Sequence, residues 1–172
     1  MVYRRDFRSP RKSTSLISRL SMTHLIILIN VIAFFMFSIL NLTFGSGVEH
    51  VSACTNESFN STSLENSFYI QPCHIISGQY LWTIITSMFM HGGFFHLFVN
   101  MFSLFFLGSL TERIIGRKRF FWAYLIAGIF GSLFFVLFAY IGGFVPRGDY
   151  VFGGIDDFAV GASGAIFGFL GY

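Results

Sequence analysis

Three long runs of apolar residues dominate the pattern along the chain. They lie near residues 20–43, 94–111 and 120–141, and none of them contains Asp, Glu, Lys or Arg. A helix rises about 1.5 Å per residue, so about 20 residues cross the hydrocarbon core of a bilayer. Each run has about this length, and the pattern therefore predicts three membrane-spanning helices.

Two shorter apolar stretches do not fit a full crossing. Residues 81–90, "LWTIITSMFM", are expected to lie in the membrane interface or to dip partway into the bilayer. The last stretch, "GASGAIFGFLGY", starts a fourth helix at Gly161, but it would cover only about 18 Å. A terminal carboxylate inside the bilayer is costly. We therefore expect the N-terminal part of a longer protein, cut within its fourth helix.

The composition excludes a water-soluble globular domain. Of the 172 residues, 54% are hydrophobic and 11% are charged, where an average soluble domain has about 25% charged residues. The 25 phenylalanines are more than a core of this size can hide from solvent. We predict an all-α polytopic membrane protein, a helix bundle with three complete transmembrane helices and the start of a fourth.

Basic and acidic segments alternate between the predicted helices. Residues 1–19 and 112–119 are rich in Lys and Arg, whereas residues 45–80 and 142–160 carry more acidic than basic residues. Lys and Arg concentrate on the cytoplasmic side of membranes. We therefore expect a multi-pass protein whose basic tail, residues 1–19, is cytoplasmic. The first apolar run is longer than that of a signal peptide, so we interpret it as a retained helix.

The expected external loop, residues 45–90, carries two further features. Asn56 and Asn60 start tripeptides that match the N-glycosylation pattern, whose use depends on whether the loop reaches a secretory lumen. Cys54 and Cys73 lie in the same loop. A disulfide in an oxidising compartment and two unpaired thiols are both open interpretations.

Two polar side chains share one face near the start of the second predicted helix. His96 and Asn100 are one turn apart in "HGGFFHLFVN", and Ser103 extends the same face. Such groups are costly inside a membrane unless they meet partners in the protein interior. They are either hydrogen-bonding contacts between helices or part of a functional site.

Ser163 lies in the first turn of the fourth predicted helix, among small residues. Glycines recur there at spacings of three and four, which allows unusually close helix packing: Gly161, Gly164, Gly168 and Gly171. Both the second and the fourth helix descend from the outer side in the predicted topology. Ser163, His96 and Asn100 are therefore expected at a similar shallow depth near the external face.

These three side chains suggest acyl-transfer chemistry. A serine that attacks a carbonyl needs hydrogen-bond donors placed where the oxyanion develops. Asn100 can offer its amide and His96 a ring N–H, and the unpaired backbone N–H groups of a helix start can add to them. A general base is missing. We do not expect the remaining histidines to serve as the base: His24, His50, His74 and His91.

Three segments in order resemble the rhomboid family of intramembrane serine proteases. They are "HGGFFHLFVN", "ERIIGRKRF" and "GASG", and the resemblance covers roughly the last half of the chain. It implies that Ser163 is the nucleophile and that His96 and Asn100 help to bind the oxyanion. It also implies that residues 20–172 form an incomplete rhomboid-like domain. The general base of the family is a histidine on a sixth helix, beyond this chain.

The resemblance extends to some structural positions and fails at others. Glu112 and Arg113 match a structural cluster at the inner end of the second helix. The family often has Trp-Arg where this chain has Trp82 and Thr83, which places a loop-anchoring contact in question. Phe167 stands where some members have a tyrosine that packs on the catalytic histidine.

The leading hypothesis is an intramembrane serine endopeptidase that cleaves transmembrane segments of membrane proteins near the external face. Its expected partners are these substrates and the lipid bilayer, not nucleic acid. The alternative is a non-catalytic relative that binds and escorts transmembrane clients. A channel or transporter is disfavoured, because the three spans carry no charges along a pore. No cofactor or metal is implied, since no zinc-binding pattern accompanies the histidines.

Overall fold

A computed structural model describes residues 21–44, 67–148, 151, 153–154 and 157–168. Several features named above lie outside this part of the chain: the basic tail 1–19, Cys54, Asn56 and Asn60. Cys73 is disulfide-bonded, and Cys54 is the other cysteine of the chain.

Three helices are long and apolar enough to cross a membrane, as the sequence predicts. The first is α2 (Met22–Phe44). The second consists of α6 (Phe94–Ser103), a π-helical turn η2 (Leu104–Gly108) and α7 (Ser109–Ile115). The third is α8 (Arg117–Gly142). The described residues thus form the predicted helical bundle.

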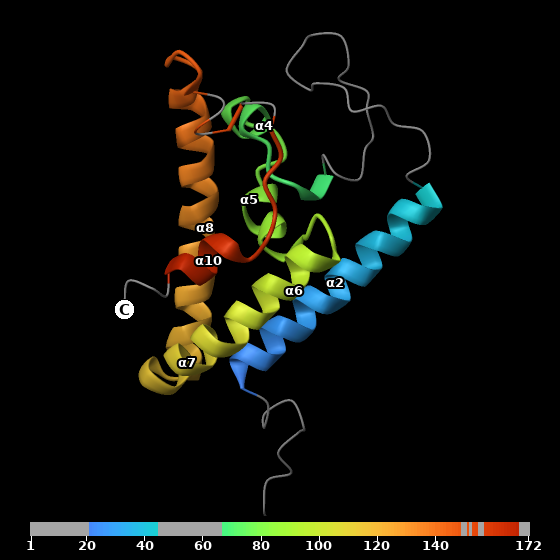
Figure 1. Ribbon diagram of the computed structural model, residues 1–172, viewed down its shortest axis with the longest axis vertical. Helices are drawn as coiled ribbons and strands as arrows, with labels where there is room; N and C mark the ends of the chain where they lie inside the picture. Colours follow the sequence, from blue (N-terminus) through green and yellow to red (C-terminus); the bar gives the residue numbers. More distant parts are fainter. Residues whose placement is uncertain (1–20, 45–66, 149–150, 152, 155–156, 169–172) are drawn as a thin grey trace, which may run out of the picture.

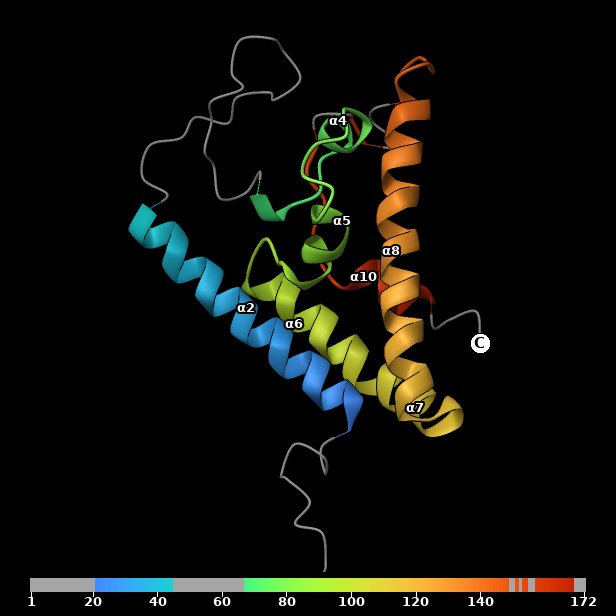
Figure 2. The same ribbon diagram turned by 180° about the vertical axis from the view of Figure 1, so that it is seen from behind.

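Short elements occupy the rest of the described chain. They are α4 (Pro72–Ile76), α5 (Thr83–Thr86), the 3-10 turn η1 (Ser87–Phe89) and α10 (Ser163–Phe167). Figures 1 and 2 show α4 and α5 beside the half of α8 that ends at Gly142, away from α7. The stretch 81–90 is therefore not a spanning helix, in agreement with the prediction from its length.

The apolar side chains of the spanning helices fall into two groups, one packed inside the bundle and one exposed on its outer faces. A cluster of buried side chains joins α2, α6, α8 and α10 at the centre: Ile26, Met88, Leu97, Met101, Leu104, Phe120, Tyr124, Ala162, Ala165 and Ile166. Many other large apolar side chains on α2, α6 and α8 are exposed. Because water would disfavour so much exposed apolar surface, these outward faces suit contact with lipid.

Glu112 connects the second spanning helix to the start of the first. One carboxylate oxygen, Oε1, accepts a hydrogen bond from the Met22 backbone N–H at 2.7 Å. The other, Oε2, accepts bonds from the Thr23 backbone N–H at 2.8 Å and the Thr23 hydroxyl at 2.6 Å. The first N–H groups of a helix have no partner within it, so Glu112 satisfies two of them. The second helix continues to Ile115, beyond the end of the apolar run at residue 111.

Backbone hydrogen bonds attach the segment 67–90 to the chain just before α10. Ile70 and Ala159 form an isolated antiparallel bridge, with N···O distances of 3.2 and 3.0 Å. The Trp82 indole N–H donates to the Ser67 carbonyl at 2.8 Å, and the buried Thr83 hydroxyl donates to the Tyr80 carbonyl at 2.7 Å. Trp82 and Thr83 therefore hold this loop through local bonds, although the family's Trp-Arg pair is absent.

α10 and α8 approach each other at two glycines. A Cβ built on Gly131 would lie 2.9 Å from the Gly164 Cα, and one built on Gly164 would lie 3.3 Å from the Gly131 Cα. The glycine spacing had predicted such close packing. In both views α10 lies across α8 within the described residues, instead of running alongside it (Figures 1 and 2).

We predict that replacing Glu112 with glutamine destabilises the bundle by about 2–3 kcal/mol, because bonds to a charged acceptor are lost and an amide N–H₂ faces other donors. Denaturant titration in mixed micelles would measure the free energy of unfolding. Lys118→Gln, at an exposed neighbouring position, is the matched control and should change it by less than about 0.5 kcal/mol. Equal effects of both substitutions would contradict the role of Glu112.

Substitution of Gly131 by alanine should separate α8 from α10 and destabilise the protein by about 1–3 kcal/mol, as overpacking does. Gly143→Ala is the control in the same region, because its Cβ would meet only the Tyr140 carbonyl at an ordinary 3.5 Å. The same denaturant titration would compare the free energies of unfolding of the two variants. A Gly131→Ala protein as stable as Gly143→Ala would show that the helices are not in close contact.

Candidate active site

Ser163 is the first residue of α10, and the chain before it is held by the segment 67–90. The Gly161 backbone N–H donates to the Ser87 carbonyl at 2.8 Å, and the bridge between Ile70 and Ala159 lies two residues further back. Ser163 is partly exposed and lines a cavity of about 170 Å³ between α8 and this segment. The serine is thus placed by backbone bonds at the edge of a cavity.

His96 and Asn100 of α6 both face Gly161. A Cβ on Gly161 would lie 2.8 Å from His96 Nε2 and Cε1, and 3.2 Å from Asn100 Nδ2. Gly161 has a φ of +110°, a conformation that favours glycine. The structure therefore brings the two predicted polar side chains to the residue two positions before Ser163. Only glycine leaves room for them there.

The Asn100 side chain is an unused donor. Asn100 is buried, at 5% exposure, and its Nδ2 has no hydrogen-bond partner among the described residues. A buried amide without a partner costs free energy unless a ligand or a water satisfies it. This group could donate to a negatively charged oxygen that develops next to Gly161.

His91 belongs to the same cluster, although it was not expected to serve as the base. Its ring centroid lies 5.3 Å from that of His96, and the side chain is buried. Burial, together with the charge of a protonated His96, lowers the pKa of His91 to about 4. His91 is therefore neutral near pH 7 and packs against His96 without competing for a proton. Its position five residues before His96 offers no helical-face signal.

Along α8, the site lies near the middle of the helix. Gly164 contacts Gly131, which is eleven residues before the end of α8 at Gly142, or about 17 Å of helix. His96 and Asn100, by contrast, lie in the first turns of α6. α8 rises past the start of α6 beside α4 and α5 (Figure 1). The three residues are thus level with one another, but near the middle of the longest helix.

The Phe167 side chain, at the end of α10, is 67% exposed. Among the described residues, no group of three or more His, Cys, Asp or Glu side chains could hold a metal ion.

The arrangement can support attack of a hydroxyl on a carbonyl carbon. Ser163 supplies the hydroxyl, and the Asn100 amide and the His96 ring nitrogen lie at the preceding turn. A carbonyl oxygen placed between them would gain donors as its negative charge develops. A proton acceptor for Ser163 would have to come from a further group.

Comparisons with known proteins relate the sequence to one family. The model of the Rhomboid domain matches residues 78–172. "Putative rhomboid protease YdcA" of Bacillus subtilis is 36% identical over 97 residues, which cover 56% of this chain and 41% of that protein. "RHOMBOID-like protein 1" of Arabidopsis thaliana is 33% identical over 112 residues, 65% of this chain and 25% of that protein.

A third relative carries a different description. "Inactive RHOMBOID-like protein 8" of Arabidopsis thaliana is 48% identical over 58 residues, which cover 34% of this chain and 16% of that protein. The chain therefore spans less than half the length of each of these three relatives. No solved structure matches the chain.

Gly161→Ala should displace His96 and Asn100 or distort the turn before Ser163, because its Cβ would fall within contact distance of both side chains. We expect a loss of about 1–3 kcal/mol in the free energy of unfolding. Gly93→Ala is the matched control, since nothing lies within 4 Å of its Cβ and its φ of 170° is extended. Unchanged stability of Gly161→Ala would contradict the observed geometry.

Proposed function

Because the chain belongs to the rhomboid family, we propose that it supplies the nucleophile and the oxyanion donors of an intramembrane serine endopeptidase. The observation that supports this most directly is the buried, unpartnered Asn100 amide beside Gly161, two residues before the serine. A purely structural polar residue in a membrane would be expected to have a partner in the folded protein. The Asn100 side-chain amide is instead available to donate a hydrogen bond at the place where an oxyanion would form.

In the proposed mechanism, Ser163 Oγ attacks the carbonyl carbon of a peptide bond and forms a tetrahedral intermediate. The carbonyl oxygen becomes negatively charged and accepts hydrogen bonds from Asn100 Nδ2, a His96 ring N–H and the Ser163 backbone N–H. These donors are fixed by α6 and α10 before the reaction, so they need little reorganisation. Collapse of the intermediate expels the amine and leaves an acyl-enzyme on Ser163, which water then hydrolyses.

The proton of Ser163 needs an acceptor, and we propose a histidine of a later segment of the full-length protein. The relatives are longer than this chain, so such a segment is reasonable. Among the described histidines, His96 is the one that faces Gly161, and its proposed role requires a donor. His24 lies near the start of α2, where its ring contacts Phe105 of η2.

The proposed substrates are transmembrane segments of other membrane proteins, cleaved near the external side. This is supported by α10, which contacts the middle of α8, a helix long and apolar enough to cross a membrane; a soluble peptide would have little access there. A substrate helix would have to unwind locally, because a helical peptide bond is shielded by its own hydrogen bonds.

A non-catalytic role is the second candidate, because one relative with high identity is described as inactive. In that case the protein would bind and escort transmembrane clients. The intact Gly-Ala-Ser-Gly segment favours catalysis, since a binding protein has no need of the serine.

We predict that Ser163→Ala in the full-length protein abolishes cleavage of a co-expressed single-span substrate without changing expression. Ser38→Ala is the matched control, because the Ser38 hydroxyl donates only to the Phe34 carbonyl of its own helix. It should leave cleavage unchanged. Persistent cleavage by Ser163→Ala would refute the proposed nucleophile.

Asn100→Ala should lower kcat by about 10²- to 10³-fold with a small change in KM, as loss of an oxyanion donor does. A serine-reactive fluorophosphonate probe adds a second measurement: Ser163 Oγ bonds to phosphorus and fluoride leaves. Labelling of the wild type but not of Ser163→Ala supports catalysis. A protein that is folded, unlabelled and inactive, yet retains substrate in pull-down, would favour the escort role.

A further inference from the structure

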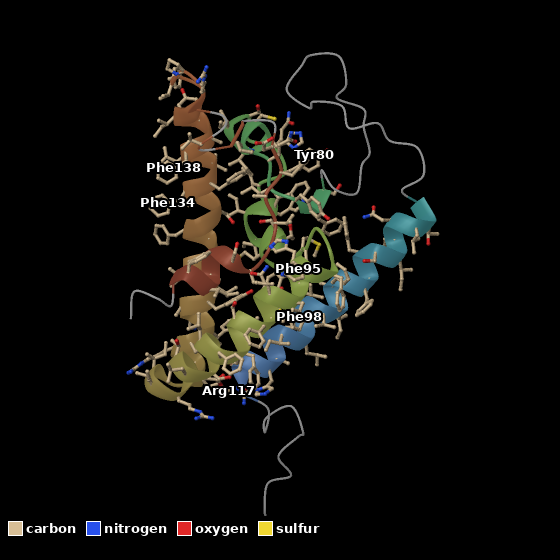
Figure 3. The ribbon with its side chains drawn as sticks, in the orientation of Figure 1. Tyr80, Phe95, Phe98, Arg117, Phe134 and Phe138 are labelled. Atoms are coloured by element: carbon tan, nitrogen blue, oxygen red, sulfur yellow. The ribbon has the colours of Figure 1, made fainter. Side chains whose placement is uncertain are left out.

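A polar cavity lies at the end of the bundle opposite α4, well away from Ser163. Its volume is about 280 Å³, and it is lined by Ser21, His24, Ser109, Glu112, Arg113 and Arg117. These residues come from the start of α2, from α7 and from the start of α8. Figure 3 shows Arg117 at this end of the molecule, where α2 begins.

The cavity is basic because its one carboxylate is already engaged. Both Glu112 oxygens accept hydrogen bonds from Met22 and Thr23, so Glu112 serves to hold α2. Arg117 interacts electrostatically with Glu112. For Arg113, no hydrogen bond or ion pair with other described residues is found, and its side chain is exposed. With the two arginines Arg113 and Arg117 and the one carboxylate of Glu112, the lining residues therefore carry one positive charge in excess.

A second donor at the cavity lacks a partner. Ser109 Oγ is buried and has no hydrogen-bond partner among the described residues. A hydroxyl can donate one bond and accept others, and an anion in the cavity would satisfy its donor. The planar guanidinium groups of Arg113 and Arg117 match the geometry of phosphate oxygens. Together these groups suit a phosphate better than a carboxylate, because phosphate offers more acceptor oxygens.

The position in the bundle indicates where such a phosphate would come from. All three spanning segments end here, at Met22, Ile115 and Arg117. The ends of spanning helices lie at the level of the lipid headgroups, and the charge pattern assigns this end to the cytoplasmic side. Basic pockets between helices on that side are suited to anionic lipids.

We propose that this cavity binds the phosphate group of an anionic lipid headgroup. Arg113 and Arg117 would bind phosphate oxygens, and Ser109 Oγ–H would donate to a third. Such a lipid would connect α7 and α8 to the start of α2, next to the bonds made by Glu112. The site is independent of the proposed protease activity, since it contains none of Ser163, His96 or Asn100.

The test compares bound lipids by native mass spectrometry of the full-length protein, released from vesicles of equal parts phosphatidylcholine and phosphatidylglycerol. The wild type should retain phosphatidylglycerol preferentially. Arg113→Gln with Arg117→Gln should lower this retention about tenfold or more, since a charge-assisted bond contributes roughly that factor. Lys118→Gln with Arg119→Gln is the matched control: it removes the same charge at exposed positions outside the cavity.

Each outcome decides the proposal. Loss of retention in the cavity variant alone supports it, whereas equal loss in both double variants indicates general attraction to the membrane surface and overturns it. The double variant Arg113→Lys with Arg117→Lys controls for misfolding, because it keeps both charges but lacks the planar guanidinium groups. It should retain less phosphatidylglycerol than the wild type, and its thermal stability should be unchanged. Displacement of the lipid by inorganic phosphate, with tight binding of phosphate alone in detergent, would assign the site to a soluble anion and refute the lipid.

Discussion

The close contact between α8 and α10 at Gly131 and Gly164 determines where the candidate nucleophile lies. A side chain at either glycine would force the two backbones apart, because the atoms it would meet belong to the main chain and cannot rotate away. In a bilayer this type of contact is favourable, since close backbone packing replaces the hydrophobic driving force that is absent in lipid. The turn before Ser163, where His96 and Asn100 approach Gly161, directly precedes this contact.

Hydrogen bonds, together with helix packing, position the chain before Ser163. The segment 67–90 has irregular backbone beside the spanning helices, and such backbone persists at membrane depth only where its polar groups find partners. The bonds from Gly161 to Ser87 and between Ile70 and Ala159 meet this requirement. The same bonds that satisfy the loop therefore hold the chain leading to the serine, so the stability of the loop and the geometry of the site are coupled.

The sequence predicts the spanning helices well, because their length and lack of charge are set by the thickness of the bilayer. It also places His96, Asn100 and Ser163 together, since helix direction follows from the charge pattern. The apolar run stops at residue 111 because Glu112 is charged, whereas the helix continues to Ile115 through Glu112 and Arg113, which the family resemblance assigns to its inner end. The contact of Gly164 with Gly131, in the middle of α8, joins segments distant in the sequence, which no local pattern contains.

The π-helical turn Leu104–Gly108 has a consequence for the whole second helix. A π-helical turn accommodates one residue more than an α-helical turn, so it rotates everything beyond it by about 100° relative to a regular helix. The number of residues in this turn therefore determines how the face with His96 and Asn100 is oriented relative to the face with Glu112. Loss of one residue there would return the turn to α-helical geometry and leave both faces nearly in place, whereas gain of a further residue would turn one end of the helix away from its partners. The turn thus accommodates a shorter second helix more easily than a longer one.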